Sequence, residues 1–187
     1  SLIIKNQTVP FNLDVGQHYF YGNIPKLMEI ILAVGTAISG YSLAHALHVG
    51  FLIAFVVFIS GILTRLYSLK TAGLAILLIV LYEEFATNSF TGYVDTATVS
   101  LEVAALIIAV NWLNYKKTWY LSIAGILIGL ALSVKYSAFA TLIFILVLLS
   151  LYIVAKKESL KQLIPFGGLA FLFSGYWYIK NLVLYQN

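Results

Sequence analysis

Residues 119–155 read WYLSIAGILIGLALSVKYSAFATLIFILVLLSLYIVA, and the one charged residue in this apolar stretch is Lys135. A single helix of this length would be about 55 Å long, whereas the hydrocarbon core of a bilayer is about 30 Å thick. A charge within such a segment is costly unless it faces a cavity, a partner or the membrane surface. We therefore expect two helices, 119–134 and 136–155, that meet in a turn at Lys135.

The composition is that of an integral membrane protein. Hydrophobic residues make up 61% of the chain, charged residues make up 10%, and the mean hydropathy is +0.96. The apolar runs are continuous and do not alternate with polar residues, which predicts helices and not a barrel of strands. The lysines flank these runs and form no stripe, so the net charge of +4 does not indicate nucleic-acid binding. The chain has no cysteine, which excludes disulfides and thiolate metal sites.

We predict an all-α fold with about six transmembrane helices and one interfacial helix. The expected regions are an extracytoplasmic loop over 1–24, an interfacial helix over 25–40 and a transmembrane helical domain over 41–187. The second region is short and amphipathic and begins at Pro25, so we expect it to lie along the membrane surface. The expected spans are 42–64, 71–90, 95–113, 119–134, 136–155 and 163–182.

Basic residues in the short loops predict the orientation. With six spans, seven of the eleven basic residues fall on one side, which is therefore the cytoplasmic side. These seven are Arg65, Lys70, Lys116, Lys117, Lys156, Lys157 and Lys161. If 119–155 were a single span, the Lys-Lys pairs before and after it would lie on opposite sides, which the charge pattern argues against. Lys135 is therefore expected on the extracytoplasmic side.

Several polar residues fall on this predicted outer side and could line one outward-facing cavity. We expect the main substrate-binding candidates to be Asp95, Lys135, Tyr136 and Lys180, with Glu83, Glu84, His45 and His48 as further lining residues. Two lysines at one site would suit an anionic group such as a phosphate, because an ammonium group is a compact charge for phosphate oxygens. The catalytic residue stays unknown at this point.

Each candidate also has a purely structural explanation, which the sequence leaves open. Lys135 can reach the interface as a snorkelling side chain, and Lys180 with its neighbouring aromatic residues can anchor a helix at the membrane surface. Asp95 can cap a helix. The remaining four residues can be solvated or packed, and two histidines are too few for a metal site, so no metal ligand set is predicted.

Four short motifs occur in an order that resembles a known family. They are Tyr21-Gly22-Asn23-Ile24-Pro25-Lys26-Leu27-Met28-Glu29, Tyr93-Val94-Asp95, Gly129-Leu130-Ala131-Leu132-Ser133-Val134-Lys135-Tyr136-Ser137-Ala138 and Tyr176-Trp177-Tyr178-Ile179-Lys180-Asn181. In this order and spacing, over nearly the whole chain, they resemble the polytopic glycosyltransferases of the GT-C superfamily. The nearest relatives are the protein mannosyltransferase and aminoarabinose transferase-like families of bacteria and archaea.

The resemblance implies an enzyme of the prokaryotic cell membrane. Its members transfer a sugar from a polyprenyl-phosphate carrier to a protein, lipid or glycan acceptor on the extracytoplasmic side. The lysine of their Gly-Leu-Ala-x-x-x-Lys pattern lies by the carrier phosphate and matches Lys135. Their Trp-Tyr-x-(Arg/Lys)-Asn pattern matches 177–181, with lysine in place of the usual arginine. Whether a divalent cation is needed stays open.

The resemblance also bears on the missing catalytic residue. In the family, the catalytic carboxylate follows the first transmembrane helix, whereas this chain has no predicted helix before residue 25. We therefore expect that acid to lie upstream, and the chain to be a fragment that is inactive alone. Asp14 is not in the context of the family's motif and is not assigned as the base.

Two other classes of protein stay open. A membrane transporter or channel is favoured by a charge at a helix break, but the two halves of the chain show no matching pair of broken helices. A membrane scaffold without chemistry would leave the charges of the outer side scattered. A cavity lined by Lys135, Asp95 and Lys180 together would therefore count against a scaffold.

Overall fold

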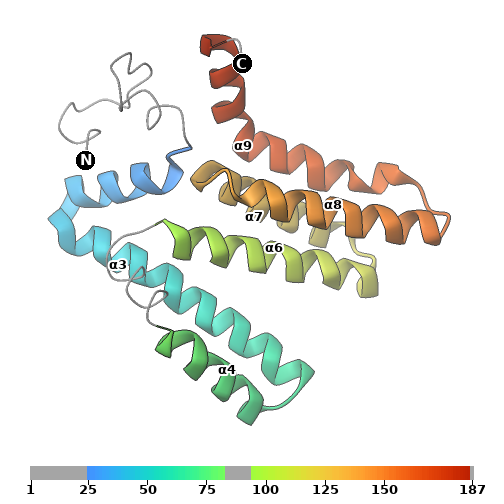
Figure 1. Cartoon of the computed structure of the whole chain (residues 1–187), viewed down its shortest axis with the longest axis horizontal. Coiled ribbons are helices and arrows are strands. Elements are labelled where there is room, and N and C mark those ends of the chain that lie inside the picture. Colours follow the sequence, from blue (N-terminus) through green and yellow to red (C-terminus); the bar gives the residue numbers. More distant parts are fainter. Residues whose placement is uncertain (1–24, 83–93, 186–187) are drawn as a thin grey trace.

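The computed structural model of the chain describes residues 25–82 and 94–185. All regular structure among these residues is helical, with no strand, as Figure 1 shows. The elements are α3 (Leu27–Leu66), α4 (Leu69–Leu81), α6 (Asp95–Tyr115), α7 (Thr118–Val134), α8 (Ala138–Ala155), the 3₁₀ helix η1 (Leu160–Leu163) and α9 (Ile164–Tyr185). The predicted all-α class is confirmed for this part of the chain.

The helix break at Lys135 is confirmed. Helix α7 ends at Val134, and Lys135 has an extended backbone with φ −151° and ψ 139°. Its N–H still donates to the carbonyl of Ala131 at 2.9 Å, and α8 begins at Ala138. The apolar stretch therefore folds back on itself, and the lysine occupies the turn.

A second break divides α3 at the predicted end of the interfacial helix. Ser39 and Gly40 have non-helical dihedral angles, and Gly40 has φ 68°, a conformation that glycine adopts without the steric cost of a side chain. The segments before and after this kink run in clearly different directions in Figure 1. The kink thus falls at the predicted end of the 25–40 region, and the assignment of that region as an interfacial helix at a membrane surface stays a prediction.

Helix α4 is shorter than the span predicted over 71–90. It ends at Leu81, where Tyr82 turns to an extended backbone with φ −70° and ψ 108°. Its 13 residues would cover about 20 Å, less than the hydrocarbon thickness of about 30 Å. The rest of the predicted span, including Glu83 and Glu84, lies outside the described residues.

Three of the described helices are long and apolar enough to cross a membrane. They comprise Leu27–Arg65, Asp95–Tyr115 and Ala138–Ala155. Helix α7 is apolar but has only 17 residues. Helix α9 has 22 residues but is not among the three, because tyrosines, a tryptophan, Lys180 and Asn181 lower the hydropathy of its C-terminal half. The chain is therefore compatible with a membrane protein, and the predicted six spans are not confirmed.

Helix α7 lies at the centre of the core, packed against both α6 and α9. Its contact with α9 depends on Gly125 and Gly129, which share one face of the helix. A Cβ atom at Gly129 would lie 2.7 Å from the carbonyl oxygen of Ala170, and one at Gly125 would overlap the carbonyl oxygen of Phe166. Small residues spaced four apart allow such close backbone approach between apolar helices. This contact fixes the Lys135 turn beside the C-terminal half of α9.

Candidate functional site

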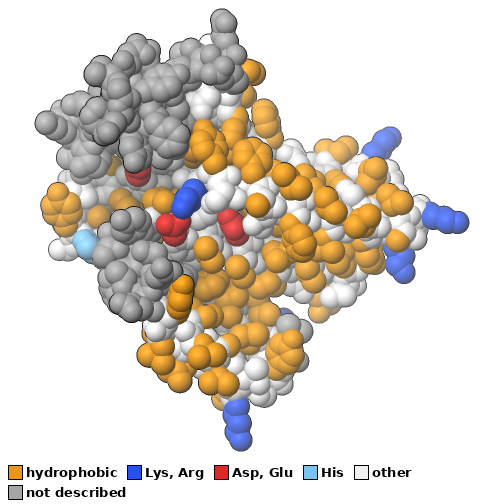
Figure 2. All heavy atoms as spheres, in the orientation of Figure 1, with side chains coloured by type: hydrophobic (Ala, Val, Ile, Leu, Met, Phe, Trp, Pro, Cys, Tyr) orange, Lys and Arg blue, Asp and Glu red, His pale blue; other side chains and the backbone are white. Residues whose placement is uncertain are grey.

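The helical bundle has two chemically different ends. The Lys135 end comprises the starts of α3 and α6, the turn between α7 and α8, and the C-terminal half of α9. The basic end comprises the end of α6, the start of α7, the end of α8, η1 and the start of α9. Figure 2 shows acidic and basic side chains side by side near the middle of the face in view, whereas further lysine and arginine side chains project from the far ends of the helices.

Asp95 and Lys135 form an ion pair at the Lys135 end. Asp95 is the first residue of α6, and its Oδ1 accepts a hydrogen bond from the Nζ of Lys135. The α6 N-terminus has no side-chain cap, so capping alone does not account for Asp95. The side chains of Lys135 and Asp95 are 46% and 41% exposed, so the pair stabilises the fold by only about 0.2–1 kcal/mol. The pairing brings together two predicted site residues.

A cavity of about 280 Å³ opens beside this ion pair. It is lined by Pro25, Lys26, Met28, Glu29, Val94, Val134, Lys135, Tyr136 and Ser137. Lys26 is only 5% exposed, and its Nζ lies 3.3 Å from Oε2 of Glu29. The wall thus combines two lysines and one glutamate with apolar side chains. This composition suits a small anionic group attached to an apolar molecule.

Tyr136 joins the turn to α9 through a hydrogen bond. The Nδ2 atom of Asn181 donates to the Tyr136 hydroxyl oxygen at 2.7 Å, and the Tyr178 hydroxyl donates to the Leu132 carbonyl at 3.3 Å. Burial raises the pKa of the Tyr136 hydroxyl and outweighs the opposite effect of the bond from Asn181. The phenol therefore stays neutral at physiological pH, with a proton that it can donate. Two motifs that are far apart in sequence meet here.

Lys180 lies near the cavity but not in its wall. The residue is 8% exposed, and its Nζ lies 5.4 Å from the ring centroid of Trp177. The second predicted lysine therefore does not line the cavity, whereas Lys26, a residue that the predicted site did not include, does.

The structure does not bring the predicted histidines to this cavity. His45 is exposed, whereas His48 is 1% exposed and faces the protein interior. Residues three apart on a helix differ by about 60° in direction, which is enough to place one outside and the other inside. Glu83 and Glu84 lie outside the described residues. Within the described part of the chain, no group of three His, Cys, Asp or Glu side chains could hold a metal ion.

Three residues of interest were missed by the sequence reasoning. Lys26 and Glu29 were quoted as part of the first motif but not selected as site residues, and their spacing of three on one helix was the available signal. Glu102 lies two helical turns after Asp95 within α6, and its Oε2 accepts a hydrogen bond from the Thr141 hydroxyl of α8 at 2.9 Å. A lone acid in an apolar helix is a recognised mark of function or interhelical pairing, and this signal was present in the sequence.

Comparisons with protein-family models, with curated proteins and with solved structures found no match to this chain. Function is therefore inferred from the residues and their geometry.

Proposed function

We propose that this chain is part of an integral-membrane glycosyltransferase with about six spans. It would move a sugar from a polyprenyl-phosphate carrier to a protein, lipid or glycan acceptor on the extracytoplasmic side of a prokaryotic cell membrane. The observation that carries the proposal is the position of Lys135. It stands in a break between two apolar helices, lines a cavity, and lies at the end of the bundle opposite the basic loops. The family resemblance of the motif around it adds support.

The proposed chemistry needs two kinds of group. A base must take the proton of the acceptor hydroxyl, and a cation must stabilise the phosphate that leaves the sugar. The Nζ of Lys135 would supply the cation. Its partner Asp95 would hold this side chain in place before the donor arrives, and an ion pair so exposed can exchange for a phosphate at little cost. We assign the catalytic base to no described residue.

The first experiment measures donor binding. The chain is placed in lipid nanodiscs, and binding of a polyprenyl phosphate is compared between wild type, Lys135→Ala and Lys135→Arg. Because a hydrogen bond to a charged group contributes about 1.5–3 kcal/mol, the alanine variant is expected to bind about tenfold or more weakly. The arginine variant should retain part of the affinity. The matched control is Lys70→Ala, which removes the same charge from the hairpin of α3 and α4.

A second ligand separates phosphate recognition from general lipid binding. The corresponding polyprenol without phosphate should bind all four proteins equally. Unchanged polyprenyl-phosphate binding by folded Lys135→Ala would remove Lys135 from the mechanism. In membranes that carry the active enzyme, the same variant should lose sugar transfer while its amount in the membrane is unchanged.

The other two classes make different predictions for the same site. A scaffold would leave the charges scattered, whereas Asp95 and Lys135 are paired. Of the three residues named for this test, only Lys135 lines the cavity, so the expected wall of Lys135, Asp95 and Lys180 is not formed. A transporter would move a solute across sealed vesicles, which the enzyme would not. Beyond the charge at the helix break, no described feature favours transport.

A further inference from the structure

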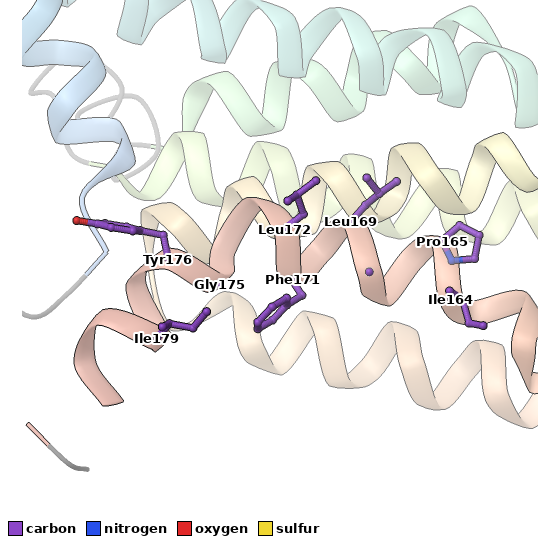
Figure 3. Close-up of a pocket in the computed structure, with 9 residues that line it drawn as sticks. Ile164, Pro165, Leu169, Phe171, Leu172, Gly175, Tyr176 and Ile179 are labelled. Atoms are coloured by element: carbon purple, nitrogen blue, oxygen red, sulfur yellow. The ribbon is translucent and has the colours of Figure 1, made fainter. Parts of the chain in front are cut away.

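The exposed face of α9 carries a long apolar groove. The groove has a volume of about 560 Å³ and is lined by Ile164, Pro165, Gly168, Leu169, Phe171, Leu172, Gly175, Tyr176 and Ile179. In Figure 3, Leu169 and Leu172 point to one side of the helix, and Phe171 points to the other. The two glycines supply no side chain to fill the space between these walls. From Ile164 to Ile179 the helix rises about 22 Å, which is longer than the roughly 15 Å of one bilayer leaflet.

A polar pocket of about 520 Å³ lies at the basic end of the bundle. It is lined by Trp112, Lys116, Thr118, Leu121, Glu158, Lys161, Gln162 and Pro165. Lys116 is already engaged, because its Nζ lies 3.0 Å from a carboxylate oxygen of Glu158 and 4.2 Å from the ring centroid of Trp112. Lys161 is exposed, as are the nearby Lys117, Lys156 and Lys157. With the charge of Glu158 already neutralised, the pocket and its rim are left with an excess of positive charge.

The groove and the pocket meet at Pro165, which lines both. A charged pocket thus borders an apolar groove that is long enough for a lipid chain. The aromatic rings of Trp119 and Tyr120 stack at this same end, with centroids 3.7 Å apart, and aromatic side chains of this kind gather at membrane–water interfaces. An amphiphile with a negative headgroup matches this arrangement in both charge and shape.

We propose that this surface is a binding site for an anionic phospholipid of the leaflet at the basic end. Its headgroup would lie against Lys161 and Gln162, and one acyl chain would lie along α9 past Gly168. Basic pockets between membrane helices select such headgroups. A second copy of the chain fits less well, because it would place two sets of lysines close together. The groove shares no lining residue with the Lys135 cavity, so this site is independent of the proposed glycosyl transfer.

Two pairs of variants test the two halves of the site. Gly168→Leu fills the groove, and Gly167→Leu is its matched control, because a Cβ at either glycine meets no protein atom within 4 Å and only Gly168 lines the groove. Lys161→Gln removes the headgroup charge, and Lys70→Gln removes one charge from the α3–α4 hairpin.

The measurement is lipid retention after brief detergent extraction from nanodiscs made with equal phosphatidylglycerol and phosphatidylcholine, quantified by native mass spectrometry. Wild type, Gly167→Leu and Lys70→Gln should retain phosphatidylglycerol in preference to phosphatidylcholine. Lys161→Gln should reduce this preference about fivefold, the effect of one lysine near a charged headgroup. Gly168→Leu should reduce the retention of both lipids.

Three results would overturn the proposal. Equal losses in Lys161→Gln and Lys70→Gln would mean that only general surface charge attracts the lipid. Full competition by inorganic phosphate would identify a free-anion pocket without a lipid chain. A dimer in wild type that Gly168→Leu converts to a monomer would show that a second copy covers the groove.

Discussion

Both ends of the α6–α9 bundle set a lysine against a carboxylate, yet the two pairs are built differently. Lys116 binds both carboxylate oxygens of Glu158, at 3.0 and 3.1 Å, and its Nζ lies about 4 Å from the ring centroids of Trp112 and Tyr152. Lys135 has one carboxylate oxygen of Asp95 as its partner, and each of the two lysines also lines a pocket. The lysine with several partners is held in the fold, and we infer that the one with a single ion-pair partner can exchange it more easily. The number of partners around each ammonium group, and not the residue type, is thus the basis for proposing a structural role for Lys116 and a binding role for Lys135.

The largest loss of stability is expected from disrupting the contact between α7 and α9, because both ends of the bundle depend on it. Gly129→Leu would force a side chain against the backbone at Ala170, which cannot move as a flexible side chain can. We expect a loss of at least about 3 kcal/mol of stability, at or above the usual range for overpacked cores. Thermal unfolding in detergent would show this loss. Gly73→Leu, on α4 with no atom within 4 Å of an added Cβ, should unfold like wild type.

Replacing either of the two lysines by alanine should lower the free energy of unfolding, but by different amounts. Lys116→Ala removes two charged hydrogen bonds to one carboxylate and two ring contacts, at a pair whose side chains are 34% and 30% exposed. We expect it to cost about 1–2 kcal/mol after allowance for that exposure. Lys135→Ala should cost about 1 kcal/mol or less. Denaturant titration of both proteins would measure the difference, and a larger loss for Lys135→Ala would reverse the assignment of roles.

The smallest expected effect concerns the bond that ties the Lys135 turn to α9. Tyr136→Phe removes the oxygen that accepts from Asn181 and keeps the ring that packs on Tyr178. We expect a loss of about 0.5–1.5 kcal/mol, with donor binding weakened less than in Lys135→Ala. The exposed Tyr67→Phe serves as the control in the same unfolding assay. An unchanged unfolding midpoint for Tyr136→Phe would show that the ring packing alone holds the turn.

Local features of the fold were predictable because single residues determine them. One lysine in an overlong apolar run predicted the turn at 135, and the amphipathic pattern that ends at Gly40 predicted the division of α3. The end of α4 at Leu81 was missed, although the apolar run stops there and the charged pair Glu83-Glu84 follows Tyr82 in the sequence.

Contacts between residues on different helices were harder to predict than the candidate residues themselves. Asp95 and Lys135 were both selected, but their pairing depends on how α6 packs against α7. The burial of Lys26 and the backbone contact at Gly125 also arise only when distant segments meet. His45 and His48 are the opposite case. Their spacing suggested that both line one cavity, but α3 is oriented so that His45 is exposed and His48 is buried.

The proposal requires that the two ends of α7 lie on opposite sides of the membrane, and accessibility labelling tests this most directly. Because the chain has no cysteine, Ser137→Cys, Lys117→Cys and Lys156→Cys each introduce a unique thiol. In intact cells, a membrane-impermeant maleimide should label position 137 and should reach positions 117 and 156 only after the membrane is opened. Labelling of position 137 from the same side as positions 117 and 156 would contradict the account.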